Sequence, residues 1–381
     1  MIIAAIDLLG QLIDIAEKAA KIARLCRAEN GHLFSLLIQE KSNEQKNPRF
    51  IRDFKTFADV LIQEVAKYWL ETKFVGLSHR VYGEETNHFE NKLGESITVQ
   101  IESDRQKTRS MLMRILDGND QIADSLLDII YGNDCTNTDQ ITASKVELEL
   151  NDIAVWIDPI DSTSEYINGR SNHGMEPLSP HGLHCVTCLF GVYHTKTGLP
   201  VMGVLNQPFY KSNDNDLLNG RCIWGFQIDG ICRNNLPECS DSQTLHTRPI
   251  LIGGHESDEI VNKLNRISST LYVAGAGYKL LCVILSEAYL LVTSSKTTFY
   301  WDTCAGHAIL RSLGGGVVPL DDIIQMDSTE KCLPNQLERL QVKYGPKNGH
   351  ISETPAYNHN KGLVAYQSIE SMHKVVKTLQ R

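Results

Sequence analysis

Two aspartates, Asp158 and Asp161, stand close together in the stretch AVWIDPIDSTSEY (154–166), with a proline between them. Proline fixes its own φ angle and restricts the residue before it, so we expect the chain to leave an apolar strand here in a defined turn. The turn would aim both carboxylates at one point and expose the Ile160 carbonyl between them. An all-oxygen set of this kind suits Mg²⁺, Mn²⁺ or Ca²⁺ and does not suit zinc.

Two hydroxyl side chains, Ser162 and Thr163, follow these aspartates directly. If a helix begins here, its free N–H groups and the two hydroxyls form an anion site beside the metal. Metal ligands next to a phosphate site are the minimum needed for metal-assisted phosphate chemistry. The alternative is a turn with an ordinary helix cap, because Asp and Ser are favoured N-cap residues. The hexapeptide alone does not decide between the two.

Acidic residues elsewhere in the chain bear on that choice. Glu84 and Glu85 follow a glycine at the end of a predicted strand, Asp59 lies at the start of an apolar helix, and Asp302 follows a run of aromatic residues where another helix begins. Each has an ordinary alternative. The glutamates could be a solvated pair, Asp59 a capping or surface residue, and Asp302 a plain N-cap.

Four short motifs connect these residues to a known pattern. T-x-A-D, G-E-E, W-x-D-P-[IL]-D-[ST]-T and W-D-x-x-A occur in this order between Thr56 and Ala305. They resemble the motifs of the lithium-sensitive, magnesium-dependent phosphomonoesterase superfamily, which includes inositol monophosphatase and bisphosphate nucleotidase. Connecting stretches such as LHCVTCLFGVYHTKTGLPVMGVLNQPF and AGAGYKLLCV extend the resemblance over nearly the whole chain, and favour the branch that acts on inositol polyphosphates.

The resemblance implies a cofactor and a mechanism. The cofactor is Mg²⁺, as two or three ions, with Li⁺ as an inhibitor and Ca²⁺ as a further inhibitory ion. Asp59 and Thr163, with Glu84, would act as the catalytic residues that orient and deprotonate a metal-activated water, which attacks the phosphate directly without a phosphoenzyme. The metal ligands that it implies are Glu84, Glu85, Asp158, the Ile160 carbonyl, Asp161 and Asp302.

The implied reaction is removal of the 1-phosphate from inositol 1,4-bisphosphate and inositol 1,3,4-trisphosphate. At one position the chain departs from the family, which tends to place a serine before the acidic start of the next helix, where this chain has GHE around His255. A protonated His255 could bind a distal phosphate, or the residue could lie in a surface loop. The substrate-binding residues that we predict are Asp161, Ser162, Thr163, His255, Gly275, Ala276 and Lys279.

Two alternative functions remain. The same metal chemistry could serve a 3′(2′),5′-bisphosphate nucleotidase acting on adenosine 3′,5′-bisphosphate. Adenine would need an apolar or aromatic slot in the pocket wall around 255–279, whereas inositol would need hydrogen bonds. The other alternative is a non-catalytic protein that binds inositides or metal ions. The presence of every implied catalytic group, Asp59 and Thr163 included, argues against it.

The elements that must position these residues can be read from the periodicity. We expect an α+β half over 1–170, with a polar surface insertion at 87–148, and from Pro249 onward an alternation of strand and helix within an α/β half over 171–381. The resemblance implies a layered αβαβα sandwich of the inositol monophosphatase and fructose-1,6-bisphosphatase type. Predicted segments are helices at 2–28, 57–70 and 119–131, strands at 78–86 and 152–157, a hairpin at 183–205, and loops with an edge strand at 211–247.

Composition restricts the partners and the compartment. The chain has 381 residues and a formal net charge of −9, with no basic stripe, so we expect no nucleic-acid partner. An acidic protein can still bind an anionic substrate through metal ions. No apolar run reaches membrane-spanning length, and ten cysteines without a secretory signal indicate reduced thiols. We therefore expect a cytoplasmic monomer that binds a small-molecule inositol polyphosphate and inserts into no membrane.

Overall fold

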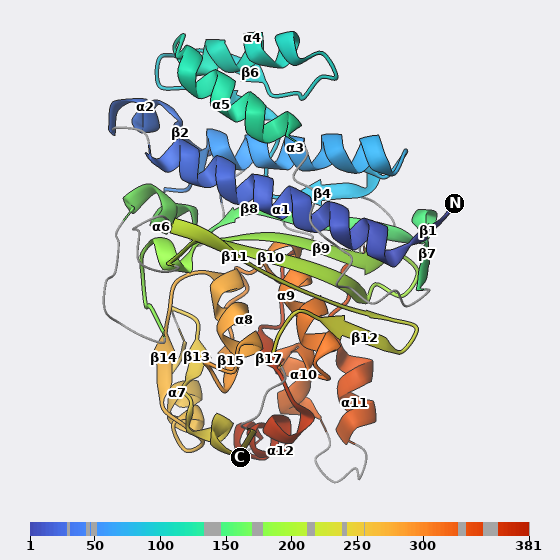
Figure 1. Ribbon diagram of the computed structural model, residues 1–381. Coiled ribbons are helices and arrows are strands. Elements are labelled where there is room, and N and C mark those ends of the chain that lie inside the picture. The colour runs from blue at the N-terminus through green and yellow to red at the C-terminus, as the bar shows by residue number, and fades with distance from the viewer. Residues whose placement is uncertain are drawn as a thin grey trace.

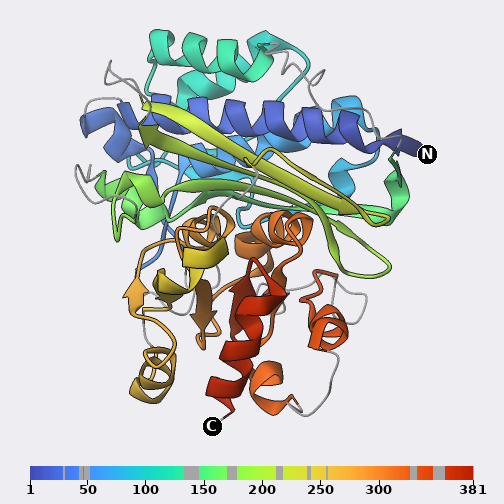
Figure 2. The same cartoon turned by 60° about the horizontal axis from the view of Figure 1, so that its bottom comes forward.

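Layers of helix and sheet alternate through the molecule (Figures 1 and 2). From the top of Figure 1 they are a helix layer, a six-stranded sheet, a second helix layer, a five-stranded sheet and an outer helix layer. The expected αβαβα sandwich is confirmed. The structure is a computed structural model. It describes residues 1–28, 31–42, 46, 52–132, 146–169, 178–211, 218–237, 242–254, 256–326, 333–345 and 357–380.

The helices are α1 (Ala5–Ala28), α2 (Gly31–Leu36), α3 (Phe57–Lys73), α4 (Arg105–Ile115), α5 (Asp120–Tyr131), α6 (Thr163–Asn168), α7 (Asp258–Leu264), α8 (Ala276–Ile284), α9 (Tyr300–Ser312), α10 (Leu320–Gln325), α11 (Leu333–Leu340) and α12 (Ile369–Leu379). The strands are β1 (Ile2–Ala4), β2 (Ile38–Glu40), β3 (Phe54–Thr56), β4 (Val81–Gly83), β5 (His88–Glu90), β6 (Ser96–Thr98), β7 (Glu147–Glu149), β8 (Ile153–Asp161), β9 (Thr187–His194), β10 (Pro200–Lys211), β11 (Leu218–Ile228), β12 (Ile231–Asn234), β13 (Ile250–Ile252), β14 (Thr270–Tyr272), β15 (Leu290–Thr293), β16 (Gly316–Val318) and β17 (Leu363–Tyr366).

Helices α1 and α3 cover one face of the six-stranded sheet. The inward-facing apolar residues predicted for α1, such as Leu12 and Ile22, are fully buried. Helix α3 begins at a capping box, in which Thr56 is the N-cap and the Asp59 carboxylate accepts the Thr56 backbone N–H. The predicted helix at 2–28 is confirmed except for its first residues, which form β1 and pair with β7.

The six-stranded sheet has the order β12-β11-β10-β9-β8-β4, and all of its pairings are antiparallel except that of β4 with β8. Every residue of β8 is buried, because α3 packs on one face of this strand and α9 on the other. The sheet takes strands from both sides of the predicted division at residue 170, and the chain passes from this sheet to the five-stranded sheet between β12 and β13. The predicted loop region 211–247 contains β11, a long inner strand, because its apolar residues pair with β10.

The aspartate stretch does not leave the strand in a turn as we expected. Strand β8 continues to Asp161, and its register against β9 shifts where Asp158 pairs with Leu189 and Asp161 pairs with Thr187. Three steps along β8 therefore match two along β9, which is a β-bulge. In a regular strand, residues three apart point to opposite faces. The extra residue brings both carboxylates to the same side, and the proline sits where no ladder hydrogen bond is needed.

Helix α9 lies directly on a row of glycines in the sheet. Gly203 in β10 is paired with Gly191 in β9 and with Gly225 in β11. A Cβ on Gly203 would lie 2.1 Å from the Ala305 carbonyl oxygen, and one on Gly191 would lie 2.5 Å from the Ala305 nitrogen. Only glycine permits this approach of helix and sheet backbones. The row thus sets the depth at which α9 sits on the sheet.

The five-stranded sheet has the order β14-β13-β15-β17-β16 and lies beyond α8 and α9. Strands β13, β14 and β15 are parallel, whereas β17 is antiparallel to β15 and β16. Helices α7, α10, α11 and α12 form the outer layer. The alternation of strand and helix that the sequence predicts after residue 249 is therefore confirmed, with the antiparallel strand β17 inserted into the sheet.

The segment 87–148 contributes more to the core than a surface insertion would. Helices α4 and α5 lie above α1 and α3 in Figure 1, and Leu112, Leu126 and Ile130 are fully buried in the same hydrophobic cluster as α1. Helix α4 was not predicted, because polar residues outnumber apolar ones along it. Across the described ranges, no helix is both long and apolar enough to cross a membrane.

Candidate active site

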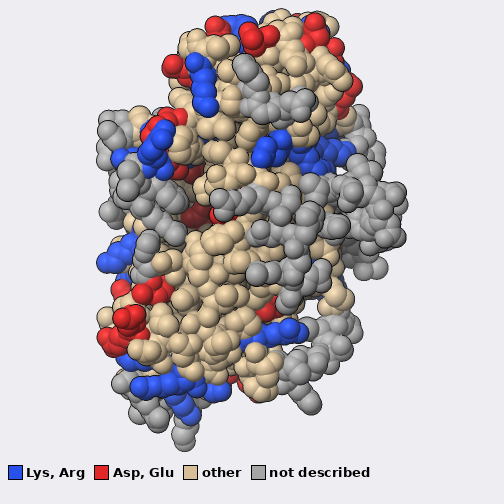
Figure 3. All heavy atoms as spheres, turned by 90° about the vertical axis from the view of Figure 1, so that its left-hand side faces the viewer, with Lys and Arg blue, Asp and Glu red and all other residues tan. Residues whose placement is uncertain are grey.

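A pocket opens between the end of β8 and the N-terminal ends of α8 and α9. Figure 3 shows acidic side chains recessed between the upper and lower parts of the molecule. Most of the predicted site residues meet here. The predicted residues that line the pocket are Glu84, Asp158, Ile160, Asp161, Ser162, Thr163, Gly275, Ala276, Lys279 and Asp302.

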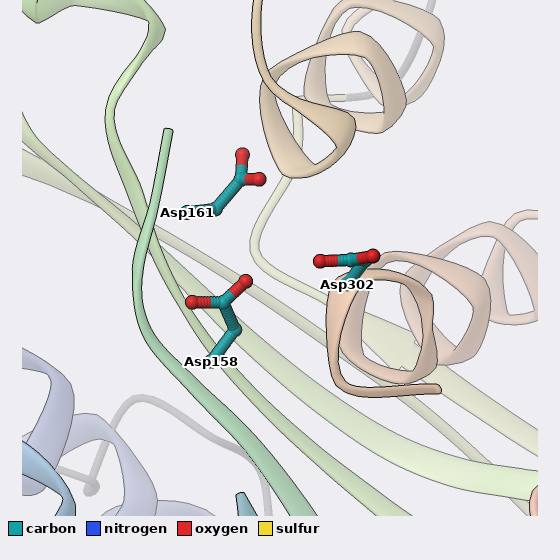
Figure 4. A group of neighbouring side chains, drawn as sticks. All are labelled: Asp158, Asp161 and Asp302. Atoms are coloured by element: carbon teal, nitrogen blue, oxygen red, sulfur yellow. The ribbon is translucent and has the colours of Figure 1, made fainter. Parts of the chain in front are cut away.

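Three carboxylates converge at the base of this pocket. Asp158 and Asp161 extend from β8 and face Asp302, which extends from the first turn of α9 (Figure 4). One oxygen from each lies within 4.8 Å of the others. Asp302 is held by the Phe299 backbone N–H, which donates to its Oδ2 at 2.6 Å. Asp302 is therefore not the N-cap but lies one turn in, with its other oxygen directed at the strand acids.

Burial and mutual repulsion disfavour the charged forms of these acids. Desolvation, followed by the charges of Glu84 and Asp161, raises the pKa of Asp158 well above its ordinary value. Desolvation and then the charge of Asp161 raise the pKa of Asp302 in the same direction. Asp158 Oδ1 is buried, and no described residue donates a hydrogen bond to it. A buried carboxylate oxygen without a donor is available to bind a cation.

The two glutamates lie at the end of β4 on the other side of Asp158. The Glu85 backbone is held by Gln63 of α3, whose Oε1 accepts its N–H at 3.1 Å. Lys41 Nζ lies 2.6 Å from an oxygen of each glutamate. Burial raises the pKa of Glu84 to about 7, although Lys41 opposes the shift. Glu84 lines the pocket, whereas Glu85 lies behind it with a side chain 5% exposed.

The predicted catalytic pair, Asp59 and Thr163, is not joined by a hydrogen bond in the described contacts. Asp59 Oδ2 accepts the Thr56 hydroxyl at 2.6 Å, and its Oδ1 is buried with no described partner. The Thr163 hydroxyl donates to the Ile160 carbonyl at 3.1 Å. Burial, followed by the charge of Glu85, raises the pKa of Asp59 to about 8. One carboxylate oxygen thus remains available to accept a proton.

Helix α8 is attached to the acid cluster through Asp161. The Ala276 and Gly277 N–H groups donate to the two oxygens of Asp161 at 3.2 and 2.9 Å. Gly275 precedes them with φ 79°, and a Cβ there would lie 2.6 Å from the Ser162 hydroxyl oxygen. Lys279 Nζ donates to the Gly275 carbonyl at 3.3 Å. The predicted substrate residues of α8 therefore lie against the predicted metal ligands.

Some residues of the site escaped the sequence reasoning. Gln63 stands four residues after Asp59, so helical spacing alone could have placed it on the same face. Lys41 gave no local signal, because 43 residues separate it from Glu84. His255 lies outside the described residues, so its predicted role stays a prediction.

The residues present fit hard divalent cations. The converging donors are all oxygens, the type that Mg²⁺ prefers. The cluster is largely buried and includes a carboxylate oxygen, Asp158 Oδ1, without a described donor. No soft ligand lies among the converging groups.

Comparison with known proteins adds to this geometry. The inositol monophosphatase family model matches residues 8–368. Inositol polyphosphate 1-phosphatase of Mus musculus is 39% identical over 95% of this chain and 94% of its own length. The Homo sapiens protein of the same name is 36% identical over 98% and 97%. By contrast, 3′(2′),5′-bisphosphate nucleotidase 1 of Dictyostelium discoideum is 31% identical over 49% of this chain.

Solved structures share the fold at low identity. Extragenic suppressor protein SuhB from Bartonella henselae aligns with a TM-score of 0.52 and 13% identity, over 98% of this chain and 99% of its own. Inositol monophosphatase II from Staphylococcus aureus aligns with a TM-score of 0.51 and 12% identity, over 99% and 95%. At such identities the likeness concerns the layered architecture alone.

Proposed function

This chain belongs to the inositol monophosphatase family, and on that premise we propose that it removes the 1-phosphate from inositol 1,4-bisphosphate and inositol 1,3,4-trisphosphate in a Mg²⁺-dependent reaction. It is a phosphatase. The observation that carries the proposal is the convergence of three carboxylates, two of them buried, at the base of a pocket whose wall holds Lys279. Full-length similarity to inositol polyphosphate 1-phosphatases supports the choice of substrate.

Two or three Mg²⁺ ions are the proposed cofactor. Bound Mg²⁺ would neutralise phosphate charge and lower the pKa of water toward about 7. Li⁺ would inhibit by taking one of the metal positions. We assign the ions to Glu84, Glu85, Asp158, the Ile160 carbonyl, Asp161 and Asp302.

The proton of the attacking water would pass to Asp59 through Thr163. The buried Oδ1 of Asp59, to which no described residue donates a hydrogen bond, supports this role, because it can take up a proton when the carboxylate is ionised. To join the relay, the Thr163 hydroxyl must turn from the Ile160 carbonyl, to which it now donates. Glu84, with its pKa raised to about 7, faces the same pocket and is the third proposed catalytic residue.

Phosphate and ring would bind on either side of these groups. Ser162 and Thr163 stand at the start of α6, where backbone N–H groups and hydroxyl groups can donate hydrogen bonds to the scissile phosphate. Gly275 and Ala276 leave room for the ring, and Lys279 supplies a cation for a second phosphate.

The pocket wall favours inositol over adenine. Beyond the acids, eight serine and threonine side chains line the pocket beside the aromatic residues Phe54, Phe299 and Trp301, and their hydroxyl groups suit a ring that carries several hydroxyl groups. The described part of the segment 255–279 gives the pocket one aromatic side chain, Tyr272. The hydroxyl residues in the lining are Ser162, Thr163, Ser164, Thr293, Ser295, Thr297, Thr298 and Thr303.

The test is phosphate release with Mg²⁺ from inositol 1,4-bisphosphate and adenosine 3′,5′-bisphosphate, side by side, with and without Li⁺. We expect Li⁺-sensitive turnover of the inositide alone. Turnover of the nucleotide instead would keep the metal assignment and refute the substrate. No release from either compound would favour the non-catalytic alternative. The cytoplasmic location and the monomeric state stay predictions.

A further inference from the structure

Lys41 occupies the space between the two glutamates of the site. Its Nζ lies 2.6 Å from Glu84 Oε1 and 2.6 Å from Glu85 Oε1, and its side chain is 4% exposed. Its backbone is anchored as well, because the Lys41 N–H donates to the Asp53 carbonyl at 2.8 Å. The segment that follows β2 thus positions the ammonium group of Lys41 between the two glutamates.

A second lysine nearby serves a different purpose. Lys55 Nζ donates to the His88 carbonyl at 2.7 Å and lies 4.0 Å from Glu85 Oε2. Its main partner is therefore backbone, and it remains satisfied whatever happens at the glutamates. The described contacts of Lys41 Nζ are the two carboxylates themselves.

An ammonium ion and a divalent cation cannot both occupy this position. Mg²⁺ binds carboxylate oxygens at about 2.0–2.1 Å and demands near-octahedral surroundings. With Lys41 Nζ 2.6 Å from both glutamates, a cation that engages the same two oxygens must displace it. Each state has a compensating positive charge, which stabilises two neighbouring carboxylates that are partly removed from water.

We propose that Lys41 is an internal competitor for the metal, whose ammonium group neutralises Glu84 and Glu85 in the metal-free enzyme and must leave before Mg²⁺ binds them. This inference rests on the proposed function, because it takes both glutamates as metal ligands. Its consequence is that Lys41 weakens Mg²⁺ binding at the glutamates and keeps the metal-free site folded. By linkage, the two cations lower each other's affinity by one and the same factor.

The test measures Mg²⁺ binding without substrate, by calorimetric titration of metal-free protein. Lys41→Gln removes the charge and keeps hydrogen-bond donors, and Lys41→Met removes both. We expect each variant to bind Mg²⁺ at the glutamates about tenfold more tightly than the wild type, within the usual range of coupling between competing ligands. Lys41→Arg retains the charge and should stay close to wild type.

Thermal unfolding gives a second readout. In EDTA the neutral variants should melt below the wild type, because two partly buried carboxylates lose their counter-ion, and Mg²⁺ should raise their melting temperature by more. Lys67→Met is the matched control, since it removes a lysine that pairs with Glu64 at 2.8 Å outside the pocket. It should leave Mg²⁺ binding unchanged.

The outcomes distinguish a failure of the competitor role of Lys41 from a failure of the proposed function on which it rests. Unchanged or weaker Mg²⁺ binding by Lys41→Gln, in a wild type that binds Mg²⁺, would overturn the competitor role alone. A wild type that takes up no Mg²⁺ would overturn the metal assignment and the proposed function with it. If Lys41→Met does not fold without metal, the Lys41→Gln titration still decides.

Discussion

At the scale of single residues, Asp161 has the most demanding position. Its carboxylate converges with Asp158 and Asp302, yet both of its oxygens also accept N–H groups from the start of α8. Thr187 donates to the same carboxylate at 3.2 Å. Asp302 makes a simpler contact, because the Phe299 N–H takes one oxygen and leaves the other to face the strand acids. A change at Asp302 thus perturbs the acid cluster with the least effect on the rest of the site.

Asp302→Asn should therefore remove activity and keep the fold. The amide oxygen can still accept the Phe299 N–H, whereas the negative charge is lost. We expect turnover to fall by at least about a hundredfold, the usual cost of removing one such electrostatic group. Because Asp302 also repels its neighbours, the metal-free variant should melt no lower than the wild type. Asp158→Asn should likewise abolish turnover. Initial rates and circular dichroism check both, and a near-wild-type rate would rule out the metal assignment.

At the scale of elements, the glycine row under α9 decides where Asp302 stands. Gly191, Gly203 and Gly225 lie side by side on three strands, so the helix rests on backbone instead of side chains. The bulge in β8 sets the other half of the cluster, because it turns Asp158 and Asp161 to one face. Two departures from regular sheet thus bring three carboxylates within 4.8 Å.

Gly203→Ala should push α9 away from the sheet. The new Cβ would lie 2.1 Å from the Ala305 carbonyl oxygen, which is backbone and cannot rotate aside. We expect a loss of about 1–3 kcal/mol in the free energy of unfolding, together with weaker Mg²⁺ binding as Asp302 moves. Denaturant titration and calorimetry measure the two effects. Gly345→Ala is the control, because its Cβ would meet nothing closer than 3.9 Å. Equal effects of both substitutions would refute this role of the row.

Much of this arrangement could be predicted from local sequence. The helix periodicity of α1, the capping position of Asp59 in α3 and the alternation after residue 249 are local signals, whereas the layered sandwich itself was expected from the family resemblance. Through the same resemblance, the four motifs implied that Asp59, Glu84, Asp158 and Asp302 belong to one site. What could not be predicted depends on distant partners. Strand β11 is specified by its pairing with β10, and Lys41 by two glutamates more than 40 residues away.

At the scale of the whole molecule, a buried network of polar side chains connects α9 to the chain that follows α11 and to β17. His307 of α9 contacts the Tyr344 hydroxyl at 3.0 Å and Gln341 Oε1 at 2.7 Å. Gln341 also donates to the Tyr366 hydroxyl in β17 at 2.8 Å. Helix α9, which carries Asp302, thus packs against the glycine row on one side and is held by the hydrogen bonds of His307 on the other. Its position depends on both sheets.

This network predicts how stability depends on pH. Burial, followed by the charge of Arg311, holds the pKa of His307 well below its ordinary value, so the folded state keeps the imidazole neutral. The unfolded chain binds a proton below about pH 6.5. Stability from this residue is therefore complete above that pH and falls as the pH drops toward the folded-state pKa, by about 1.4 kcal/mol per pH unit.

His307→Gln should remove that part of the slope. Urea unfolding between about pH 7 and about pH 5 measures it, and the difference between wild type and variant should shrink as the pH falls. His373→Gln, at an exposed position, is the control and should follow the wild type. Parallel curves for wild type and His307→Gln would show that His307 takes up its proton without unfolding.

Helix α9 covers the six-stranded sheet but follows all of its strands in the chain, which has a consequence for folding during synthesis on the ribosome. Asp161 and the strands up to β12 leave the exit tunnel well before Asp302, which follows Asp161 by about 140 residues. At about 5–20 residues per second, this interval lasts on the order of ten seconds. During it, the glycine row and the apolar face that α9 later covers are bare, and the acids already made lack their last partner. We therefore expect the nascent chain to expose this apolar face at that stage, and the reaction centre is among the last parts of the enzyme to be completed.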